Sequence, residues 1–335
     1  MYKIIIKESC GMIRSKGVSL RTPCEILVNN IDPIIYQLRL LGITNYKIIN
    51  LQKHNKSNIN NQKTINLISP VKLGCNEDLP DKRDFNIKSV ILKNNILTLP
   101  DKISYMKEMS SVKNQGRLGS CVGFAITAMK EWQEQREHEK EIAEGKKYRR
   151  KEKHYNLSEQ WVYYKSKEID PWPNQEGTSI RCAMKQLSKY GVPPENAWPY
   201  NDREKGKPKR WSKMIAKWGL GGIYFRINSV EELEDSLFEY GPIVGGIYCF
   251  REIFSVGSNG VVHYPKNTNE IFGGHAICFV GYNRKEKIFI FKNSWGSNWG
   301  HKGYGYIHYD YVRNFMMDAW VILDMNVDIN KIKGF

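Results

Sequence analysis

Long apolar runs are missing from this sequence of 335 residues. The longest ones, "GPIVGGIY" and "GGHAICFVGY", are far shorter than the roughly 20 residues that a membrane-spanning helix needs. The opening "MYKIIIKESC" also lacks the apolar stretch and the small-residue cleavage site of a secretory signal. The sequence therefore predicts no membrane partner and no secretory leader.

Cysteines are few, scattered and odd in number. The seven are Cys10, Cys24, Cys75, Cys121, Cys182, Cys249 and Cys278. Such a set fits the cytoplasm or another reducing compartment better than a disulfide framework. Because no pair has C-x-x-C spacing, a zinc site is not expected.

Acidic residues are scarce near the N-terminus. Residues 1–75 contain eleven Lys and Arg but three Asp and Glu, so they carry +8 of the net charge of +16. A basic segment of this kind suits an anionic partner or a larger assembly. Simple solubility, or a Lys- and Asn-rich composition from an AT-rich genome, explains the charge equally well.

The chain divides by composition into three parts. Residues 1–52 contain three strand-like runs, "YKIIIK", "CEILV" and "NYKIINL", and a helix-like stretch over 32–42 with Asp32 as N-cap, Pro33 at the first turn and Gly42 at the end. Residues 53–74 are polar, rich in Asn and without periodicity, which is typical of a linker. A larger domain is expected over 75–335.

This larger domain changes character along its length. Helical patterns come first, at "CVGFAITAMKEW", "LSEQWVYY" and "SIRCAMKQLSKYG", and short strand-like runs dominate from residue 219 onward. The basic stretch at 146–153 is typical of a solvated turn. Helices followed by strands predict an α+β fold of two lobes, one helical and one β-rich, with a cleft between them.

The stretch "NQGRLGSCVGFA", residues 114–125, places Cys121 at the start of the clearest predicted helix. Apolar residues follow it at helical spacing, namely Val122, Ala125, Ile126, Met129 and Trp132. A helix N-terminus lowers the pKa of a thiol, because peptide dipoles and free N–H groups stabilise the thiolate. Cys121 is therefore a candidate nucleophile, with an inert core cysteine as the alternative.

A nucleophilic cysteine needs a base, and the base needs an orienting group. His275, in "GGHAICFVGYN", precedes an apolar strand and follows two glycines. Asn293, in "FKNSWGSNWGHKGYGY", lies beside Trp295, which is suited to shielding a His–Asn hydrogen bond from water. The alternatives are a core histidine and a turn asparagine.

Together these motifs resemble the papain family of cysteine peptidases over roughly residues 80–325. "NQGRLGSC", "LSEQ", "GGHA" and "NSWGSNWGHKGYGY" occur in the family's order. The resemblance implies that Cys121 is the nucleophile, His275 the base and then the acid, Asn293 its orienting group, and Gln115 an oxyanion donor. It implies no cofactor. Gly177, in "NQEGTSI", is expected to pair with the substrate backbone, although a plain turn is nearly as good an explanation.

Two positions depart from the family pattern. Leu118 replaces a cysteine that usually forms a disulfide, which suits a reducing location, and Val122 replaces an aromatic residue. "PDKRDF" and Leu118 resemble prokaryotic or viral members, so association with a virion is a further candidate location. The family's prodomains are helical, whereas residues 1–52 are strand-rich.

The sequence therefore predicts a cysteine endopeptidase that cleaves protein or peptide substrates, with a small N-terminal domain that docks it on a larger assembly. Two rivals for that domain are an inhibitor folded over the cleft and a part of the peptidase core. For the whole chain, the alternatives are a virion or assembly component with little or transient activity, and a Cys–His amidase acting on cell-wall peptides.

Overall fold

The structure is a computed structural model. It describes the strands within residues 2–50, and then residues 72–79, 81–89, 99–145, 155–219 and 221–323. The chain divides into two compact units, Met1–Leu67 and Ile68–Phe335, which are described separately. The limits expected from the sequence for a domain over 1–52 and a linker over 53–74 stay predictions.

The N-terminal unit contains two small antiparallel sheets. Its three-stranded sheet has the order β4-β1-β5, with β1 (Tyr2–Ile6) between β4 (Cys24–Val28) and β5 (Tyr46–Asn50). These are the three runs that the sequence marks as strands. A second sheet pairs β2 (Met12–Ser15) with β3 (Val18–Arg21). The helix expected over 32–42 lies outside the described residues.

The larger unit begins with a helical lobe. Its helices are α2 (Cys121–Ala143), α3 (Glu159–Lys167), α4 (Ile180–Tyr190) and α5 (Ser212–Ala216), with 3₁₀ turns η3 (Glu195–Ala197) and η4 (Lys217–Gly219). A further 3₁₀ turn, η2 (Ile87–Ser89), packs on β9 and α6 of the second lobe. Ser158 and Ser179 cap α3 and α4 by accepting from the N–H groups of Trp161 and Cys182. The basic stretch at 146–153 lies outside the described residues.

The second lobe is built on an eight-stranded sheet of order β11-β14-β13-β12-β10-β15-β9, with β7 pairing to β12. Its strands are β7 (Lys102–Ser104), β9 (Ile223–Ile227), β10 (Ile243–Cys249), β11 (Val261–Val262), β12 (Gly273–Asn283), β13 (Ile288–Lys292), β14 (Tyr304–His308) and β15 (Met316–Leu323). The remaining helices are α6 (Val230–Tyr240), α7 (Arg251–Phe254) and α8 (Tyr309–Phe315).

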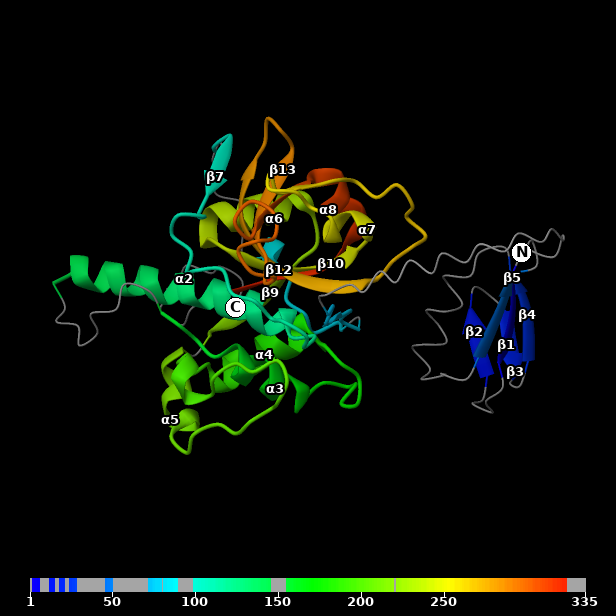
Figure 1. The fold of residues 1–335 in the computed structure, drawn as a ribbon, viewed down its shortest axis with the longest axis horizontal. Coiled ribbons are helices and arrows are strands. Elements are labelled where there is room, and N and C mark those ends of the chain that lie inside the picture. Colours follow the sequence, from blue (N-terminus) through cyan, green and yellow to red (C-terminus); the bar gives the residue numbers. More distant parts are fainter. Residues whose placement is uncertain are drawn as a thin grey trace. The chain divides into compact units, whose positions relative to one another are not determined.

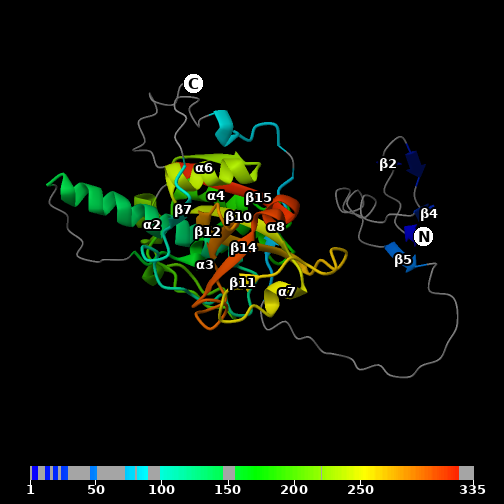
Figure 2. The ribbon, with the colours of Figure 1, turned by 90° about the horizontal axis from the view of Figure 1, so that it is seen from above.

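Two cores hold these lobes together. One lies between α2 and the sheet and contains the apolar stripe expected from the sequence, including Val122, Ile126 and Met129, all fully buried. The other packs α6 and α8 on the sheet around Phe279 and Phe289. Figure 1 shows α3, α4 and α5 on one side of α2, and β13, α6 and α8 on the other, and Figure 2 shows the sheet from above. The predicted two-lobed α+β fold is confirmed.

Candidate active site

Residues from both lobes meet where α2 begins. Cys121 is the first residue of α2, His275 lies near the start of β12, and Asn293 directly follows β13. Because β12 and β13 are antiparallel neighbours, His275 and Asn293 come together at one end of the sheet. Gln115 lies in the loop before α2 and is tied to the sheet, since its backbone N–H donates to Ser294 O at 2.9 Å.

The imidazole of His275 is fixed by a hydrogen bond and a stacking contact. Its Nε2 lies 2.8 Å from Asn293 Oδ1, which also accepts from the N–H of Ser294 at 2.8 Å. An amide oxygen only accepts, so Nε2 carries the proton and the neutral ring has its lone pair on Nδ1. Trp295 stacks on the ring with centroids 4.5 Å apart, as expected of a shield. His275 Nδ1 is buried without a hydrogen-bond partner.

The sulfur of Cys121 lies beside the backbone that carries this histidine. The N–H of Ala276, the next residue after His275, donates to Cys121 Sγ at 3.4 Å. The side chain of Ser120, the N-cap residue, does not cap the helix and instead bonds the hydroxyl of Tyr200 at 2.6 Å. The backbone N–H groups of Cys121 and Val122, at the start of α2, face the Cys121 sulfur and favour the thiolate.

Both reacting groups are fully buried in this form of the chain. Burial raises the pKa of the Cys121 thiol to about 11, although backbone N–H groups of Ala276 and Gly74 oppose the shift. Burial also lowers the pKa of His275 to about 4, opposed by its hydrogen bond to Asn293. Desolvation disfavours the charged forms, so the pair is a neutral thiol and a neutral imidazole here.

Gln115 is buried and its amide is held in one orientation. Its Oε1 accepts from the hydroxyl of Ser294 at 2.7 Å, which directs Nε2 away from that residue. Nε2 donates to two backbone oxygens, of Lys72 at 2.9 Å and Leu118 at 3.0 Å. The geometry gives a fixed N–H donor close to the start of α2, as an oxyanion site needs.

Gly177 also lies at this junction, against the backbone of Gly74. Its φ of +87° is in the region that favours glycine, and a β-carbon there would lie 2.6 Å from Gly74 O. The next residue, Thr178, donates its backbone N–H to Gly74 O at 3.0 Å. The glycine therefore allows a close approach to an extended segment. All five residues singled out in the sequence surround the same junction.

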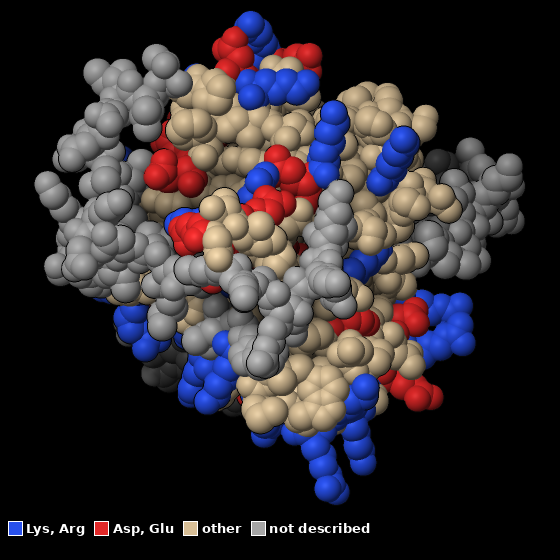
Figure 3. Space-filling model, turned by 90° about the vertical axis from the view of Figure 1, so that its left-hand side faces the viewer, with Lys and Arg blue, Asp and Glu red and all other residues tan. Residues whose placement is uncertain are grey.

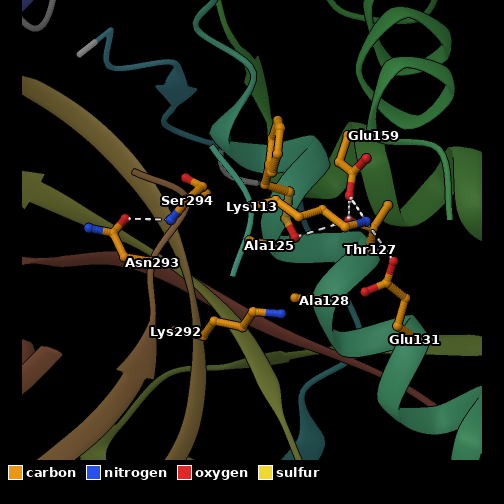
Figure 4. A pocket seen from close by; sticks show the side chains of 11 residues that line it. Lys113, Ala125, Thr127, Ala128, Glu131, Glu159, Lys292, Asn293 and Ser294 are labelled. Carbon is orange, nitrogen blue, oxygen red and sulfur yellow. Dashed lines mark hydrogen bonds and ion pairs between the residues drawn. The ribbon is translucent and has the colours of Figure 1, made fainter. Parts of the chain in front are cut away.

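A buried ionic cluster beneath the junction ties its parts together (Figure 4). Lys113 Nζ lies 2.8 Å from Glu131 on α2 and 2.5 Å from Glu159 on α3. Lys292, the last residue of β13, donates to both the backbone oxygen and the hydroxyl of Ser110 at 2.9 Å, and that hydroxyl donates to Glu131. The cluster links α2 to the loop before it and to β13, the strand that Asn293 follows.

Charge balance within this cluster follows from its contacts. Burial opposes the charged form of Lys113, but Glu159 and Glu131 outweigh it and raise the pKa of the ammonium. Burial raises the pKa of Glu159 against the attraction of Lys113, with Glu131 adding to the rise. A buried charge that loses its partner costs free energy. Moving α2, α3 or the loop before α2 apart would separate these charges, so the cluster holds the elements at a fixed spacing.

The comparisons with known proteins agree with this geometry. Residues 99–321 match the family model described as papain family cysteine protease. An uncharacterized peptidase C1-like protein of Acanthamoeba polyphaga mimivirus is 31% identical over 245 residues, covering 69% of this chain and 73% of that protein.

The chain belongs to the papain family of cysteine proteases.

Other relatives support the same family assignment. Mouse cathepsin K is 28% identical over 62% of this chain, and the match spans 59% of the cathepsin. The structure of xylellain, a cysteine protease from Xylella fastidiosa, superposes with a TM-score of 0.63 and 28% identity, covering 76% of this chain and 96% of that one. Procathepsin L 3 of Tenebrio molitor, at 24% identity and a TM-score of 0.55, shares the fold. The chain is a cysteine-type peptidase.

In this papain-family chain, residues 72–79 fill the expected cleft; they are called the occluding segment below. Its strand β6 (Cys75–Asn76) pairs in parallel with β8 (Thr178–Ser179) of the helical lobe. On the side of the sheet, a β-carbon at Gly274 would lie 2.2 Å from Cys75 O. The segment therefore contacts both lobes at the level of the candidate nucleophile.

The far end of the occluding segment is anchored by polar contacts. Tyr248 donates its hydroxyl to Glu77 at 2.8 Å, and the backbone N–H of Arg181 donates to Asp78 at 3.0 Å. Arg181 also donates from its guanidinium to Leu79 O at 2.6 Å. These contacts join positions 102 to 171 residues apart, so no local sequence pattern signals them.

Sequence reasoning missed the occluding segment, whose first residues it assigned to the linker, and it missed Glu176. The carboxylate of Glu176 accepts from the N–H of Gly119 at 2.9 Å, two residues before Cys121. In the part of the chain that the structure describes, no helix is long and apolar enough to cross a membrane, and no group of three or more His, Cys, Asp or Glu is arranged for a metal ion.

Proposed function

We propose that this papain-family peptidase is an endopeptidase in which Cys121 is the nucleophile, His275 the base and acid, Asn293 the orienting residue and Gln115 an oxyanion donor. One observation carries the assignment. The 2.8 Å contact between His275 Nε2 and Asn293 leaves Nδ1 as the buried nitrogen without a partner. That nitrogen is the one able to take a proton, and the neighbouring residue Ala276 touches the sulfur.

The chemistry follows from these positions. The Cys121 thiol gives its proton to His275 Nδ1, and the thiolate attacks the carbonyl carbon of the scissile bond. The oxyanion of the tetrahedral intermediate accepts from Gln115 Nε2 and from the backbone N–H of Cys121. The intermediate collapses as the C–N bond breaks, and the imidazolium protonates the leaving amine. Water, deprotonated by the imidazole, then hydrolyses the thioester and restores the thiol.

Labelling tests this assignment against the alternative of an assembly component with little activity. An epoxysuccinyl inhibitor of thiol proteases should modify Cys121 and abolish peptide cleavage. His275→Ala should lose both the labelling at neutral pH and the cleavage. A chain that stays unlabelled at Cys121 after the occluding segment has been removed would contradict the proposed mechanism.

We also propose that the N-terminal unit docks the peptidase on an anionic partner or larger assembly in a reducing compartment, a virion among the candidates. Residues 1–67 contain ten Lys and Arg and three Asp and Glu, and this net charge of +7 supports docking. A reducing compartment suits a nucleophile that acts only as a free thiol. On the face shown in Figure 3, acidic and basic side chains of the described residues are interspersed. Above the lower end of that face, the described residues therefore form no large basic patch that would bind an anionic partner.

Deleting residues 1–67 alone tests docking, because it leaves the occluding segment in place. The shortened chain should cleave peptides like the full chain, and it should lose salt-sensitive association with heparin or nucleic acid, used as anionic probes. A many-fold rise in turnover would instead make the N-terminal unit an inhibitor, and an insoluble product would make it part of the peptidase core.

A further inference from the structure

Residues 205–217 form a strongly basic stretch on the outside of the helical lobe. The stretch contains six Lys and Arg and no Asp or Glu. All six basic side chains are exposed: Lys205, Lys207, Lys209, Arg210, Lys213 and Lys217. The lower end of the larger unit in Figure 1 is formed by α5 and the loop before it, and basic side chains project from the same end in Figure 3.

The positive charge of this stretch is not neutralised by nearby carboxylates, because none of its six cations forms an ion pair within the described residues. Several exposed cations elsewhere in the chain are paired. Arg136 lies 2.9 Å from Glu139, and Arg313 lies 2.7 Å from Asp310. The cations of 205–217 repel one another, and this repulsion is relieved when an anionic surface comes close.

The backbone beneath these cations is fixed to the helical lobe. Lys205 O accepts from Gln160 Nε2 at 2.9 Å and from Trp198 Nε1 at 2.8 Å. The N–H of Lys209 donates to Ala197 O at 2.9 Å. Charges on an anchored backbone lose less conformational freedom on binding than charges on a loose tail, so the stretch is suited to docking.

Two exposed apolar side chains lie among the cations. In α5, Ser212 and Ala216 are buried, so Met214, two positions from each, lies on the opposite face. Met214 is 69% exposed, the highest value for a large apolar side chain in the described part of the chain, and Trp211 at the N-cap of α5 is 38% exposed. Since Met214 and Trp211 are three positions apart, they are neighbours on the surface.

A bilayer with anionic lipid matches both features of this surface. Lys and Arg are attracted to its negatively charged headgroups. Trp is enriched at the boundary between headgroups and acyl chains, and apolar side chains beside cations are buried at the same depth. A nucleic acid offers phosphates and base faces but no place that suits Met214, so the exposed apolar pair favours lipid.

We propose that residues 205–217 are a docking surface for membranes that contain anionic lipid, with the cations on the headgroups and with Met214 and Trp211 inserted between them. Such a surface lies on the bilayer without crossing it, so it differs from the spanning helix that the sequence excludes. It belongs to the larger unit, whereas the docking proposed above depends on residues 1–67. The inference goes beyond the endopeptidase function and does not depend on it.

Co-sedimentation of the full chain with lipid vesicles tests this proposal. The chain should bind vesicles of phosphatidylserine and phosphatidylcholine, and bind vesicles of phosphatidylcholine alone much more weakly. Met214→Gln locates the surface, because residues 1–67 are also basic and this change leaves the net charge unaltered. It should lower the partition coefficient about fourfold for each CH₂ group that no longer inserts. Ile142→Gln is the matched control, since Ile142 is 55% exposed on α2 outside the stretch, and it should leave binding unchanged.

A second pair of variants tests the cations. Lys213→Gln should lower the partition coefficient about fivefold, the usual effect of one cation near an anionic bilayer. Lys266→Gln removes the same charge from an exposed position between β11 and β12 in the other lobe. It should have little effect, because salt at 0.1 M confines the attraction to about 10 Å.

The outcomes separate this surface from its rivals. No binding to the anionic vesicles, or equal binding by Met214→Gln and Ile142→Gln, overturns the proposal. If Lys213→Gln weakens binding but Met214→Gln does not, the stretch is a general site for polyanions such as nucleic acid, and membrane docking is again overturned. Peptide cleavage should be equal in all four variants, since none of these residues contacts the candidate active site. Its absence in every chain would count against the endopeptidase function and leave the docking result standing.

Discussion

Gly74 lies so close to Gly119 that a β-carbon on Gly74 would sit 1.9 Å from the Gly119 carbonyl oxygen. No side chain fits there, because the nearest atoms belong to the backbone of the loop that leads into α2. The N–H of Gly74 is among the groups directed at the Cys121 sulfur. Nucleophilic attack needs a carbonyl carbon at that place, so the occluding segment blocks the sulfur and does not present a bond for cleavage.

Gly74→Ala should therefore expel the occluding segment and raise peptide turnover. A cost of about 1.4 kcal/mol already shifts an equilibrium between occluded and open chains tenfold, and a backbone clash of this size exceeds it, so we expect a rise of about tenfold or more. Initial rates on a fluorogenic peptide measure the effect. Gly257→Ala is the matched control, since its nearest contact would be a side-chain oxygen 3.7 Å away. Equal rates in Gly74→Ala and the wild-type chain would contradict the occlusion.

The pH dependence of Cys121 alkylation should change with the same substitution. Burial raises the thiol pKa to about 11, so the thiol is protonated below that pH and the thiolate fraction grows about tenfold per pH unit. The rate of reaction with iodoacetamide should climb in this way between about pH 6 and 9 in the wild-type chain. In Gly74→Ala, the sulfur is hydrated at a helix N-terminus, and the rate should level off at a lower pH.

Peptide mapping by mass spectrometry isolates the Cys121 signal from that of the other cysteines. The described ones, Cys75, Cys182, Cys249 and Cys278, are free and buried, and Cys182 serves as an internal reference in both proteins. Superimposable pH profiles for Cys121 in the two chains would show that the occluding segment does not desolvate the sulfur.

Gln115→Ala should separate thiol reactivity from catalysis. Alkylation of Cys121 forms no oxyanion, so its rate should be equal to or above that of the wild-type chain, since the variant also loses the contact with Lys72. Peptide turnover should fall by about 10²–10³, the usual effect of one oxyanion donor. Both measurements are best made in the Gly74→Ala background. A parallel loss of alkylation and turnover would indicate that Gln115 supports the fold instead.

Much of the candidate site was predictable because each part has a local signal. The helix start at Cys121 follows two small residues and precedes an apolar stripe, and the strand after His275 is a continuous apolar run. Such patterns determine which residues begin each element. The fold then brings His275 and Asn293 together, because they lie at the same end of neighbouring antiparallel strands.

The occluding segment was not predictable in the same way. Its strand has two residues, and its partners, such as Gly119, Thr178 and Tyr248, come from three distant parts of the chain. The contacts of Glu176 with Gly119 and Lys72 are also long-range. Its sequence neighbours in "NQEGTSI" indicate only a turn, and the ion pair with Lys72 joins residues separated by 104 positions. Hydrophobic patterns and secondary-structure propensities describe residues that are close in sequence. They give no information on contacts between distant residues.

The most direct test of the account compares Cys121→Ala with Cys182→Ala in the Gly74→Ala background. Each change removes one buried sulfur, but only Cys121 lies beside the backbone of His275. With the thermal unfolding midpoint confirming that both variants fold, initial rates of peptide cleavage are measured. The account predicts no cleavage above buffer by Cys121→Ala and near-parental cleavage by Cys182→Ala. Parental cleavage by a folded Cys121→Ala chain would contradict it.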